Sequence, residues 1–289
     1  MITLVQLLIV ALGLGCIVTT ASAQGSATVE KISFEVEGAF ERGAKVLGEL
    51  RIPDSDRNRL PAVVIINSSP GFDGRGAFYA EALNQAGIAT LEIDMFQGRG
   101  IPASPVHNLP HAYQSLRYLA AHPRVNSGRV GIMGFSWGAQ VSLLTNSASL
   151  TRQYSDGGLS FAAHLPVYPQ CWVFRTARSG KDPLLKPPIF REVTGRPVHI
   201  LTGDKDDYDG PDGCQLFLEW LPAHARRYFS LTVYEGATFA WDSRFSSAVY
   251  EAGAKRGQGG IVNVIANSET ARQSRQLAVR FFSTSLGAE

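Results

Sequence analysis

Short apolar runs alternate with longer segments of helical periodicity along most of the chain, and this pattern constrains the fold more than any other feature. Residues 62–66 (AVVII) form a continuous branched run, as expected of a strand that is covered on both faces. Residues 31–37 and 44–52 alternate between apolar and polar positions, so they predict an antiparallel pair of strands before it.

The same alternation continues to the C-terminus. Further strands are expected at 88–93, 129–134, 161–167, 198–202 and 229–234, and helices at 77–86, 111–121, 136–147, 214–224 and 269–282. Strands separated by helices pair mostly in parallel, because each helix returns the chain to the same edge of the sheet. The sequence therefore predicts an α/β fold with a mostly parallel central sheet and helices on both faces.

The composition is that of a folded globular protein. The 289 residues are 45% hydrophobic and 18% charged, which is too apolar for a disordered chain. A formal net charge of +2 argues against a surface that binds nucleic acid or an anionic membrane. No repeat, low-complexity tract or linker divides the sequence after its first segment, so we expect one domain over residues 24–289.

The first segment predicts export. Residues 2–19 are almost entirely apolar, and Ala21-Ser22-Ala23 supplies the small-x-small pattern that signal peptidase requires. We therefore expect residues 1–23 to be a signal peptide and the mature protein to be periplasmic or secreted. The apolar run is also long enough for a membrane anchor, which is the alternative. No later stretch is long and apolar enough to cross a bilayer.

Two cysteines, Cys171 and Cys214, follow the predicted signal peptide. In an exported protein an even number of cysteines predicts a disulfide. Two separate buried thiols are the alternative, because free cysteine behaves as a small apolar residue.

A G-x-S-x-G motif at residues 134–138 is the strongest signal of chemistry. An expected buried strand runs into the motif and a helical pattern follows it, which is the context of a nucleophile elbow. The glycines permit the sharp turn that exposes the hydroxyl of Ser136. The amide of Trp137, at the start of the helix, is then placed to stabilise an oxyanion. An ordinary tight turn between strand and helix is the alternative.

Beyond this motif, most of residues 30–285 resemble the dienelactone hydrolase family of α/β hydrolases. Residues 61–100 look like that family's oxyanion loop and "RG" loop with the elements around them, and residues 116–140 look like its helix into the elbow. VYPQC (167–171), VHILTGDKDD (198–207) and VYEGATFAWD (233–242) look like its last three active-site strands. The exported branch, in which serine is a common nucleophile, is the most similar. The resemblance implies an α/β-hydrolase fold that acts on a small-molecule carboxylic ester or lactone without a cofactor or metal.

The resemblance also implies the acid of the catalytic triad. Family members place this carboxylate three residues after the glycine that ends the VHILTG strand, and Asp206 holds that position here. Asp204 and Asp207 flank it. An acidic surface turn is the alternative, because the sequence DKDDYDG suits a turn. The order serine, acid, histidine is the order that α/β hydrolases use.

The histidine of the triad is replaced. The family motif Tyr-x-Gly-Ala-x-His-x-Phe-Asp corresponds to residues 234–242, and Phe239 stands where the histidine belongs. A phenyl ring cannot accept the proton of Ser136 or return it to a leaving group. In serine hydrolases the loss of this base lowers the rate by several orders of magnitude. Of the six histidines, His107 follows the "RG" segment and is the best-placed substitute.

The oxyanion loop departs from the family as well. Pro70 has no amide hydrogen, so the N–H of Ser69 is expected to be the second oxyanion donor. Arg99 in the "RG" loop and Arg244 are candidates for binding the substrate, with surface salt bridges as the alternative. Trp241 is expected to line an apolar pocket.

Two hypotheses for the function follow. The first is a serine hydrolase for a carboxylic ester or lactone, with Ser136 as nucleophile, Asp206 as acid and activity weakened by Phe239. The second is a catalytically impaired relative that keeps the pocket and acts as a small-molecule binding or regulatory protein.

Overall fold

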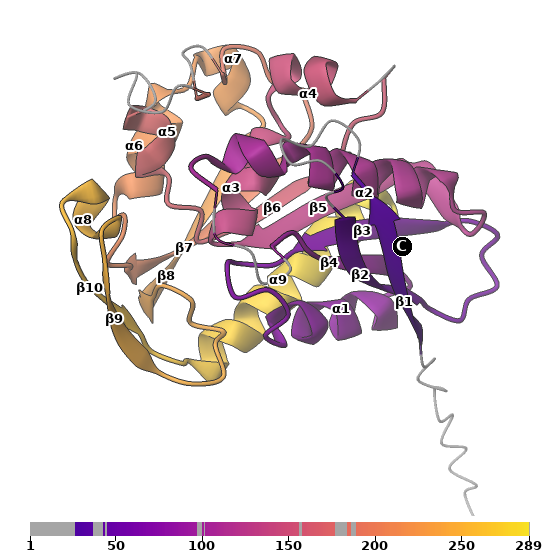
Figure 1. The fold of residues 1–289 in the computed structure, drawn as a ribbon, viewed down its shortest axis with the longest axis horizontal. Coiled ribbons are helices and arrows are strands. Elements are labelled where there is room, and N and C mark those ends of the chain that lie inside the picture. The colour runs from indigo at the N-terminus through magenta and orange to yellow at the C-terminus, as the bar shows by residue number, and fades with distance from the viewer. Residues whose placement is uncertain are drawn as a thin grey trace, which may run out of the picture.

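The computed structural model describes residues 27–36, 43, 45–96, 100, 102–155, 158–176, 184–185 and 189–288. The predicted signal peptide at 1–23 lies outside these residues. Eight strands form one sheet in the order β1-β2-β4-β3-β5-β6-β7-β8 (Figure 1). Their bounds are β1 Thr28–Glu35, β2 Lys45–Ile52, β3 Leu60–Ile66, β4 Ala89–Asp94, β5 Val125–Phe135, β6 His164–Val167, β7 Val198–Lys205 and β8 Phe229–Thr238.

The pairing of the strands confirms the predicted topology. β1 pairs with β2, and β2 with β4, in antiparallel fashion. All pairs from β4 through β8 are parallel. The carboxyl ends of β3 and β5 to β8 therefore lie along one edge, which is where ligands bind in open α/β sheets.

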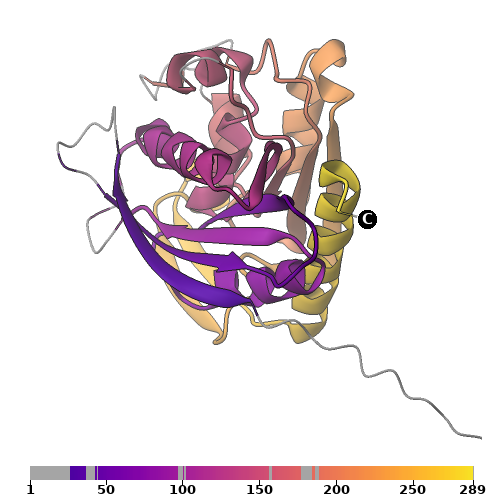
Figure 2. The same ribbon diagram turned by 90° about the vertical axis from the view of Figure 1, so that its right-hand side faces the viewer.

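Helices cover both faces of the sheet (Figures 1 and 2). Those on one face include α2 and α3, and those on the other are α1 and α9. The bounds are α1 Arg75–Gln85, η1 Pro105–Asn108, α2 Leu109–Ala121, α3 Trp137–Leu144, α4 Ala148–Tyr154, α5 Trp172–Thr176, α6 Gly213–Trp220, α7 Ala223–Arg226, α8 Ala254–Gly257 and α9 Ser268–Leu286. The helix expected at 214–224 is divided into α6 and α7, because Pro222 lacks the N–H that a helix interior needs.

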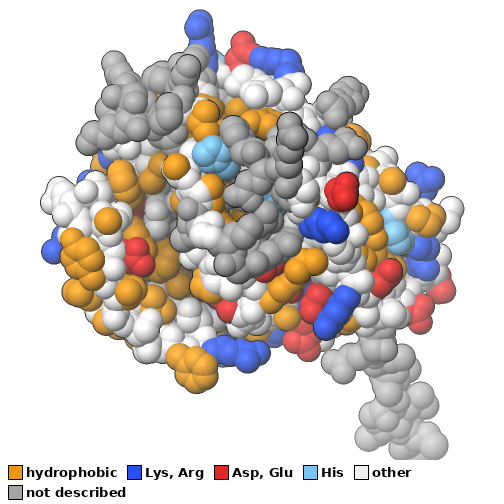
Figure 3. Space-filling view, viewed as in Figure 1, with side chains coloured by type: hydrophobic (Ala, Val, Ile, Leu, Met, Phe, Trp, Pro, Cys, Tyr) orange, Lys and Arg blue, Asp and Glu red, His pale blue; other side chains and the backbone are white. Residues whose placement is uncertain are grey.

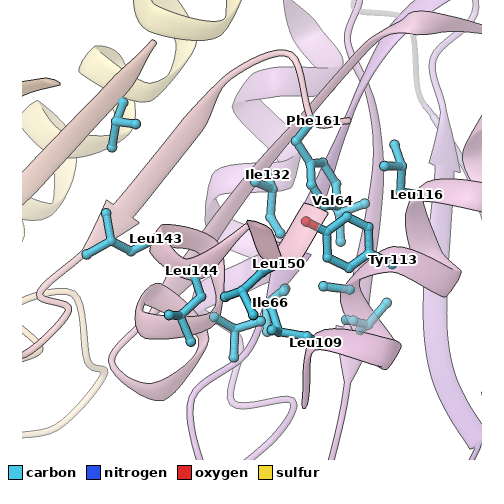
Figure 4. Packing of buried hydrophobic residues seen from close by; sticks show 14 of the residues in the cluster. Val64, Ile66, Leu109, Tyr113, Leu116, Ile132, Leu143, Leu144, Leu150 and Phe161 are labelled. Atoms are coloured by element: carbon cyan, nitrogen blue, oxygen red, sulfur yellow. The ribbon is translucent and has the colours of Figure 1, made fainter. Parts of the chain in front are cut away.

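The buried strand β3 supplies both hydrophobic cores. Ala62, Val64 and Ile66 pack into the core beneath α2 and α3, part of which Figure 4 shows. Val63 and Ile65 point to the opposite core, which includes residues of α1 and α9. Successive side chains of a strand point to opposite faces, so an uninterrupted apolar run suits a strand that is covered on both.

The last helix and the disulfide secure the C-terminal half. The side chain of Asn267 caps α9 by accepting a hydrogen bond from the N–H of Thr270 at 3.0 Å. At the other end, the carbonyl oxygen of Gly287 accepts a hydrogen bond from Arg129 at 3.2 Å. Cys171 and Cys214 form a disulfide, with their Cα atoms 5.0 Å apart.

A two-stranded hairpin stands apart from the main sheet. It consists of β9 (Ser247–Glu251) and β10 (Gly260–Val264), with α8 in its connection, and it lies beside the ends of β7 and β8 (Figure 1). The sequence pattern did not predict this hairpin. Hydrophobic side chains are exposed over the hairpin (Figure 3), and they include Tyr250 and Ile261.

No helix among the described residues combines the length and the apolar character needed to cross a membrane.

Candidate active site

Ser136 lies at a sharp turn between β5 and α3. Its backbone angles, φ 52° and ψ −112°, fall in a region that non-glycine residues rarely adopt. A Cβ atom on Gly134 would lie 2.3 Å from the carbonyl oxygen of Gly138, and one on Gly138 would lie 2.3 Å from that of Ile66. Only glycine fits at either position, so the G-x-S-x-G spacing is required by the close approach of backbone to backbone.

The surrounding backbone holds this turn. The N–H of Ser136 donates to the carbonyl of Val167 in the neighbouring strand at 3.1 Å. The carbonyl of Ser136 accepts from the N–H of Gln140 at 3.0 Å, which begins α3. The indole of Trp137 donates to Asn108 at 2.9 Å, fixing that side chain against η1. The amide of Trp137 belongs to the first turn of α3 and has no partner within the helix.

Ser136 contributes to the wall of a cavity of about 520 Å³ at the carboxyl edge of the sheet. Its other walls come from the loop after β3, from the segment after β8 and from the hairpin. The lining residues are Ser68, Ser69, Pro70, Asp73, Arg75, Ser136, Tyr208, Phe239, Ala240, Ser243, Arg244, Phe245, Ser247, Val249, Glu251, Val262 and Val264.

The loop after β3 brings Ser69 to the cavity beside Ser136. Ser69 is exposed, whereas the side chain of Asn67 is buried and donates to Glu92 at 3.2 Å. The hydroxyl of Ser68 accepts a hydrogen bond from Arg75. The loop therefore keeps Ser69 at the surface of the cavity while both preceding side chains are held by the core.

Asp206 follows the end of β7 and is 3% exposed. Its carboxylate accepts a hydrogen bond from the N–H of Tyr208 at 2.8 Å. Burial, and then the charge of Asp209, raise the pKa of Asp206 to about 7. Asp206 is not among the residues that line the cavity.

The two acids that flank Asp206 accept hydrogen bonds from backbone N–H groups of other segments. Asp204 accepts from the N–H of Gly236 at 2.7 Å, and Asp207 accepts from the N–H of Asn263 in β10 at 2.8 Å. Asp206 is thus the buried member of the three, and the other two fasten neighbouring turns to the loop.

Phe239 follows β8 and lines the same cavity as Ser136. Its ring packs edge-on against Tyr168, with centroids 5.0 Å apart, and against Tyr208, with centroids 4.7 Å apart. Residue 239, which the resemblance would make the triad histidine, therefore faces the cavity as an apolar ring.

No histidine lines the cavity among the described residues. His164 is buried beside Thr145 at 3.1 Å, and burial lowers its pKa to about 3. His199 forms a hydrogen bond of 2.8 Å with the hydroxyl of Thr232 in the neighbouring strand. His224 forms one of 2.8 Å with the carbonyl oxygen of Arg191. His107, the substitute base considered from sequence, lies in η1 outside the cavity wall.

The three expected substrate-binding residues have different outcomes. Arg244 is exposed and lines the cavity, with its guanidinium against the backbone of Gly74. Arg99 lies outside the described residues. Trp241 does not line the pocket, contrary to the expectation. Its indole is fully buried behind the site, because its N–H donates to Ser274 at 3.2 Å and its ring packs on Tyr168.

A buried network behind the site was missed from sequence. Arg75 donates to the hydroxyl of Tyr168 at 3.0 Å, and that hydroxyl donates to Asp242 at 2.6 Å. Tyr79 donates to the second oxygen of Asp242 at 3.0 Å. Arg75 also pairs with Asp73. Arg75 and Tyr168 are 93 positions apart, so no local sequence signal could have indicated their contact.

At the level of sequence, no protein-family model and no curated protein matches the chain. Among solved structures, Thermogutta terrifontis esterase 2 has a TM-score of 0.63 at 16% identity, covering 90% of this chain and 95% of that one. A protein from Klebsiella pneumoniae that is proposed to be a dienelactone hydrolase has a TM-score of 0.61 at 17% identity, covering 89% and 99%. Est1E from Butyrivibrio proteoclasticus has 0.56 at 16%, also covering 89% and 99%. These likenesses show that the chain has the α/β-hydrolase fold.

Proposed function

We propose that the protein is a serine hydrolase for a small-molecule carboxylic ester or lactone, with Ser136 as its nucleophile. The single observation that carries the proposal is the strained turn of Ser136 in the wall of a cavity. A positive φ at a non-glycine residue is unfavourable, and such strain is concentrated at functional sites. The esterases with the same fold are consistent with this chemistry.

The proposed reaction is acyl transfer through the serine. The Oγ atom of Ser136 bonds to the acyl carbon, the bond from that carbon to the alkoxy oxygen breaks, and the hydroxyl proton ends on that alkoxy oxygen, which leaves as the alcohol. Water then cleaves the acyl-serine ester and releases the acid. The N–H groups of Trp137 and Ser69 would stabilise the oxyanion. Arg244 and Arg99 would bind a negatively charged part of the substrate.

Phe239 makes this hydrolase a weak one. Neither Phe239 nor the aromatic rings around it can take up the proton of Ser136 at neutral pH. Asp206, proposed as the triad acid, has no imidazole to orient. Serine hydrolases without the triad retain roughly 10³–10⁴-fold acceleration over water, from the oxyanion hole and binding alone.

Phe239 also favours a second candidate function, that of a small-molecule binding or regulatory protein. Its ring joins those of Tyr168 and Tyr208 into a packed aromatic cluster that borders the cavity. Such a wall suits the binding of an apolar group and offers no proton transfer.

Covalent labelling distinguishes the two candidates. We would treat the natural chain, Phe239→His and Ser136→Ala with a fluorophosphonate probe, and measure p-nitrophenyl acetate hydrolysis in parallel. The hydrolase proposal expects slow labelling at Ser136 in the natural chain, faster labelling in Phe239→His and none in Ser136→Ala. Reaction of Phe239→His alone supports the binding protein. If neither the natural chain nor Phe239→His reacts, Ser136 is not a nucleophile.

We further propose that the protein is exported after cleavage behind Ala23. The disulfide between Cys171 and Cys214 supports this, because disulfides persist in oxidising compartments. The intact mass of the exported protein, measured with and without reductant after thiol alkylation, tests both the cleavage site and the bond. A mass that includes residues 1–23 supports a retained anchor instead.

A further inference from the structure

The inner face of the hairpin forms one wall of the cavity. In β9, Ser247, Val249 and Glu251 alternate with outward-facing residues, and all three line the cavity. Val249 is paired with Val262 of β10, and Ser247 with Val264. The wall is therefore apolar along most of its length and ends in a single carboxylate, that of Glu251.

The hairpin is fastened to the loop after β7. Tyr208 and Val262 belong to a small hydrophobic cluster against which Phe239 packs. Asp207 accepts hydrogen bonds from both the backbone and the side-chain nitrogen of Asn263, at 2.8 and 3.0 Å. The carbonyl of Asp207 accepts from the N–H of Lys255 at 2.8 Å. These contacts hold Glu251 and the aromatic rings in a fixed relation.

The carboxylate of Glu251 has no partner within the described chain. It makes no hydrogen bond or ion pair with a described residue, although its side chain is half-buried. The residue opposite it in β10 is Gly260. The side chain of Lys255 lies over this glycine, with its Nζ 3.5 Å from where a Cβ atom of Gly260 would be, but it forms no ion pair with Glu251. The negative charge of Glu251 acts on Tyr208, where burial first and then this charge raise the pKa of the hydroxyl. The hydroxyl of Tyr208 therefore stays protonated and uncharged beside Glu251.

The two arginines of the cavity do not neutralise Glu251. Arg75 is paired with Asp73 and bonded to Tyr168. Arg244 precedes β9 and lies against Gly74, whereas Glu251 ends β9. Ser247 and Glu251 lie four positions apart in an extended strand, which corresponds to roughly 13 Å. The carboxylate at this end of the cavity therefore forms no ion pair with a described residue, although Lys255 lies beside its strand partner Gly260.

Aromatic rings stand next to this charge. Tyr208 and Phe239 line the cavity together with Glu251, and their rings are packed edge-to-face at 64°. A carboxylate beside aromatic rings attracts an ammonium group through charge and through the negative face of a ring. With phenylalanine in place of histidine, this end of the cavity also lacks an imidazolium that would repel a cation.

We infer that the end of the cavity formed by Glu251, Tyr208 and Phe239 binds an ammonium group of the ligand. The ligand class is an ester or lactone that carries a primary or quaternary ammonium on the side away from Arg244. The ester part of this statement rests on the proposed function. The ammonium site does not, because it needs only the cavity and its charge.

Two isosteric esters test the inference. Acetylcholine and 3,3-dimethylbutyl acetate have the same shape and differ in charge, so their dissociation constants isolate the contribution of the cation. We would measure both by calorimetry or NMR titration on Ser136→Ala, which prevents acyl transfer. The expected result is tighter binding of acetylcholine, by about tenfold for an ammonium beside aromatic rings and a carboxylate.

Glu251→Gln in the same background should abolish the preference, since the amide keeps the shape and removes the charge. Glu235→Gln is the matched control, because Glu235 is exposed on β8 and does not line the cavity. Equal affinity for the two esters, no binding of either, or a preference that survives Glu251→Gln overturns the inference. Failure of fluorophosphonate labelling, with the preference intact, overturns the hydrolase proposal alone.

Discussion

The rings of Phe239 and Tyr208 pack edge-to-face with their centroids 4.7 Å apart, and the contact joins the segment after β8 to the loop after β7. The ring of Phe239 packs against the core that includes residues of α1 and α9. It also packs against the small hydrophobic cluster that contains Tyr208 and Val262. Phe239 therefore contributes to the packing of the hairpin against the rest of the domain.

Phe239→Ala should loosen the hairpin. Truncation of a largely buried phenylalanine costs about 3 kcal/mol, and here the loss falls on the contact between β9–β10 and the domain. Hydrogen exchange of the β9 and β10 amides should become faster, by more than exchange in the central strands. Phe245→Ala is the control, because Phe245 is 81% exposed and should change the stability by less than about 0.5 kcal/mol. Unchanged exchange in β9 would refute this account of the contact.

Gly138→Ala should disrupt the turn at Ser136. The new methyl would lie 2.3 Å from the carbonyl oxygen of Ile66, so either α3 or β3 must move, at a cost of about 1–3 kcal/mol or more. We expect a lower melting temperature and the loss of fluorophosphonate labelling. Gly100→Ala is the control, because a Cβ atom there meets nothing within 4 Å. Normal stability of Gly138→Ala is incompatible with the close approach described here.

The stability should depend on pH through Asp206. Its pKa is raised from 3.8 to about 7, so between these values the folded protein holds the proton more tightly than the unfolded chain. The contribution of this group to the free energy of unfolding therefore falls as the pH rises through this range and is constant above it.

Asp206→Asn removes that pH-dependent contribution. Relative to the natural chain, the variant should become progressively more stable as the pH is raised from about 5 to about 8. Urea unfolding at several pH values measures the difference. Asp54→Asn, at an exposed position, should show no such trend. A difference between Asp206→Asn and the natural chain that is flat with pH contradicts the raised pKa.

Tyr168→Phe should destabilise the protein through the buried network. The change removes one acceptor of Arg75 and one donor to Asp242, at a cost of about 1–3 kcal/mol for the buried polar atoms that lose a partner. The midpoint of urea unfolding should fall with its slope unchanged. The same substitution at Tyr250, which is 68% exposed, serves as the control. Equal midpoints for the two variants would show that the network adds nothing.

The sequence predicted the elements that have a strong local pattern. The buried run of β3 and the strand–turn–helix around Ser136 are of this kind, because burial on both faces and the glycine spacing are visible in neighbouring residues. The hairpin was missed since its strands have only five residues each and the segment between them is rich in glycine. Such segments resemble loops when they are considered alone.

The sequence did not indicate contacts between residues that lie far apart along the chain. Trp241 was expected to line the pocket, but Ser274 in α9 provides a partner for its indole on the opposite side. Arg75 was not singled out, because its acceptors come from the loop after β3 and from the residue that follows β6. In each case a polar group that becomes buried is paired with a partner that only the fold brings near.

The hydrogen bond between Arg129 and Gly287 has a practical consequence for any assay of this protein. It places the end of α9 near the start of the regular run of β5, whereas Ser136 follows the other end of that strand, roughly 23 Å along it. An affinity tag or surface attachment at the C-terminus would thus leave the mouth of the cavity open to solvent, and immobilised protein should react with soluble esters as freely as protein in solution.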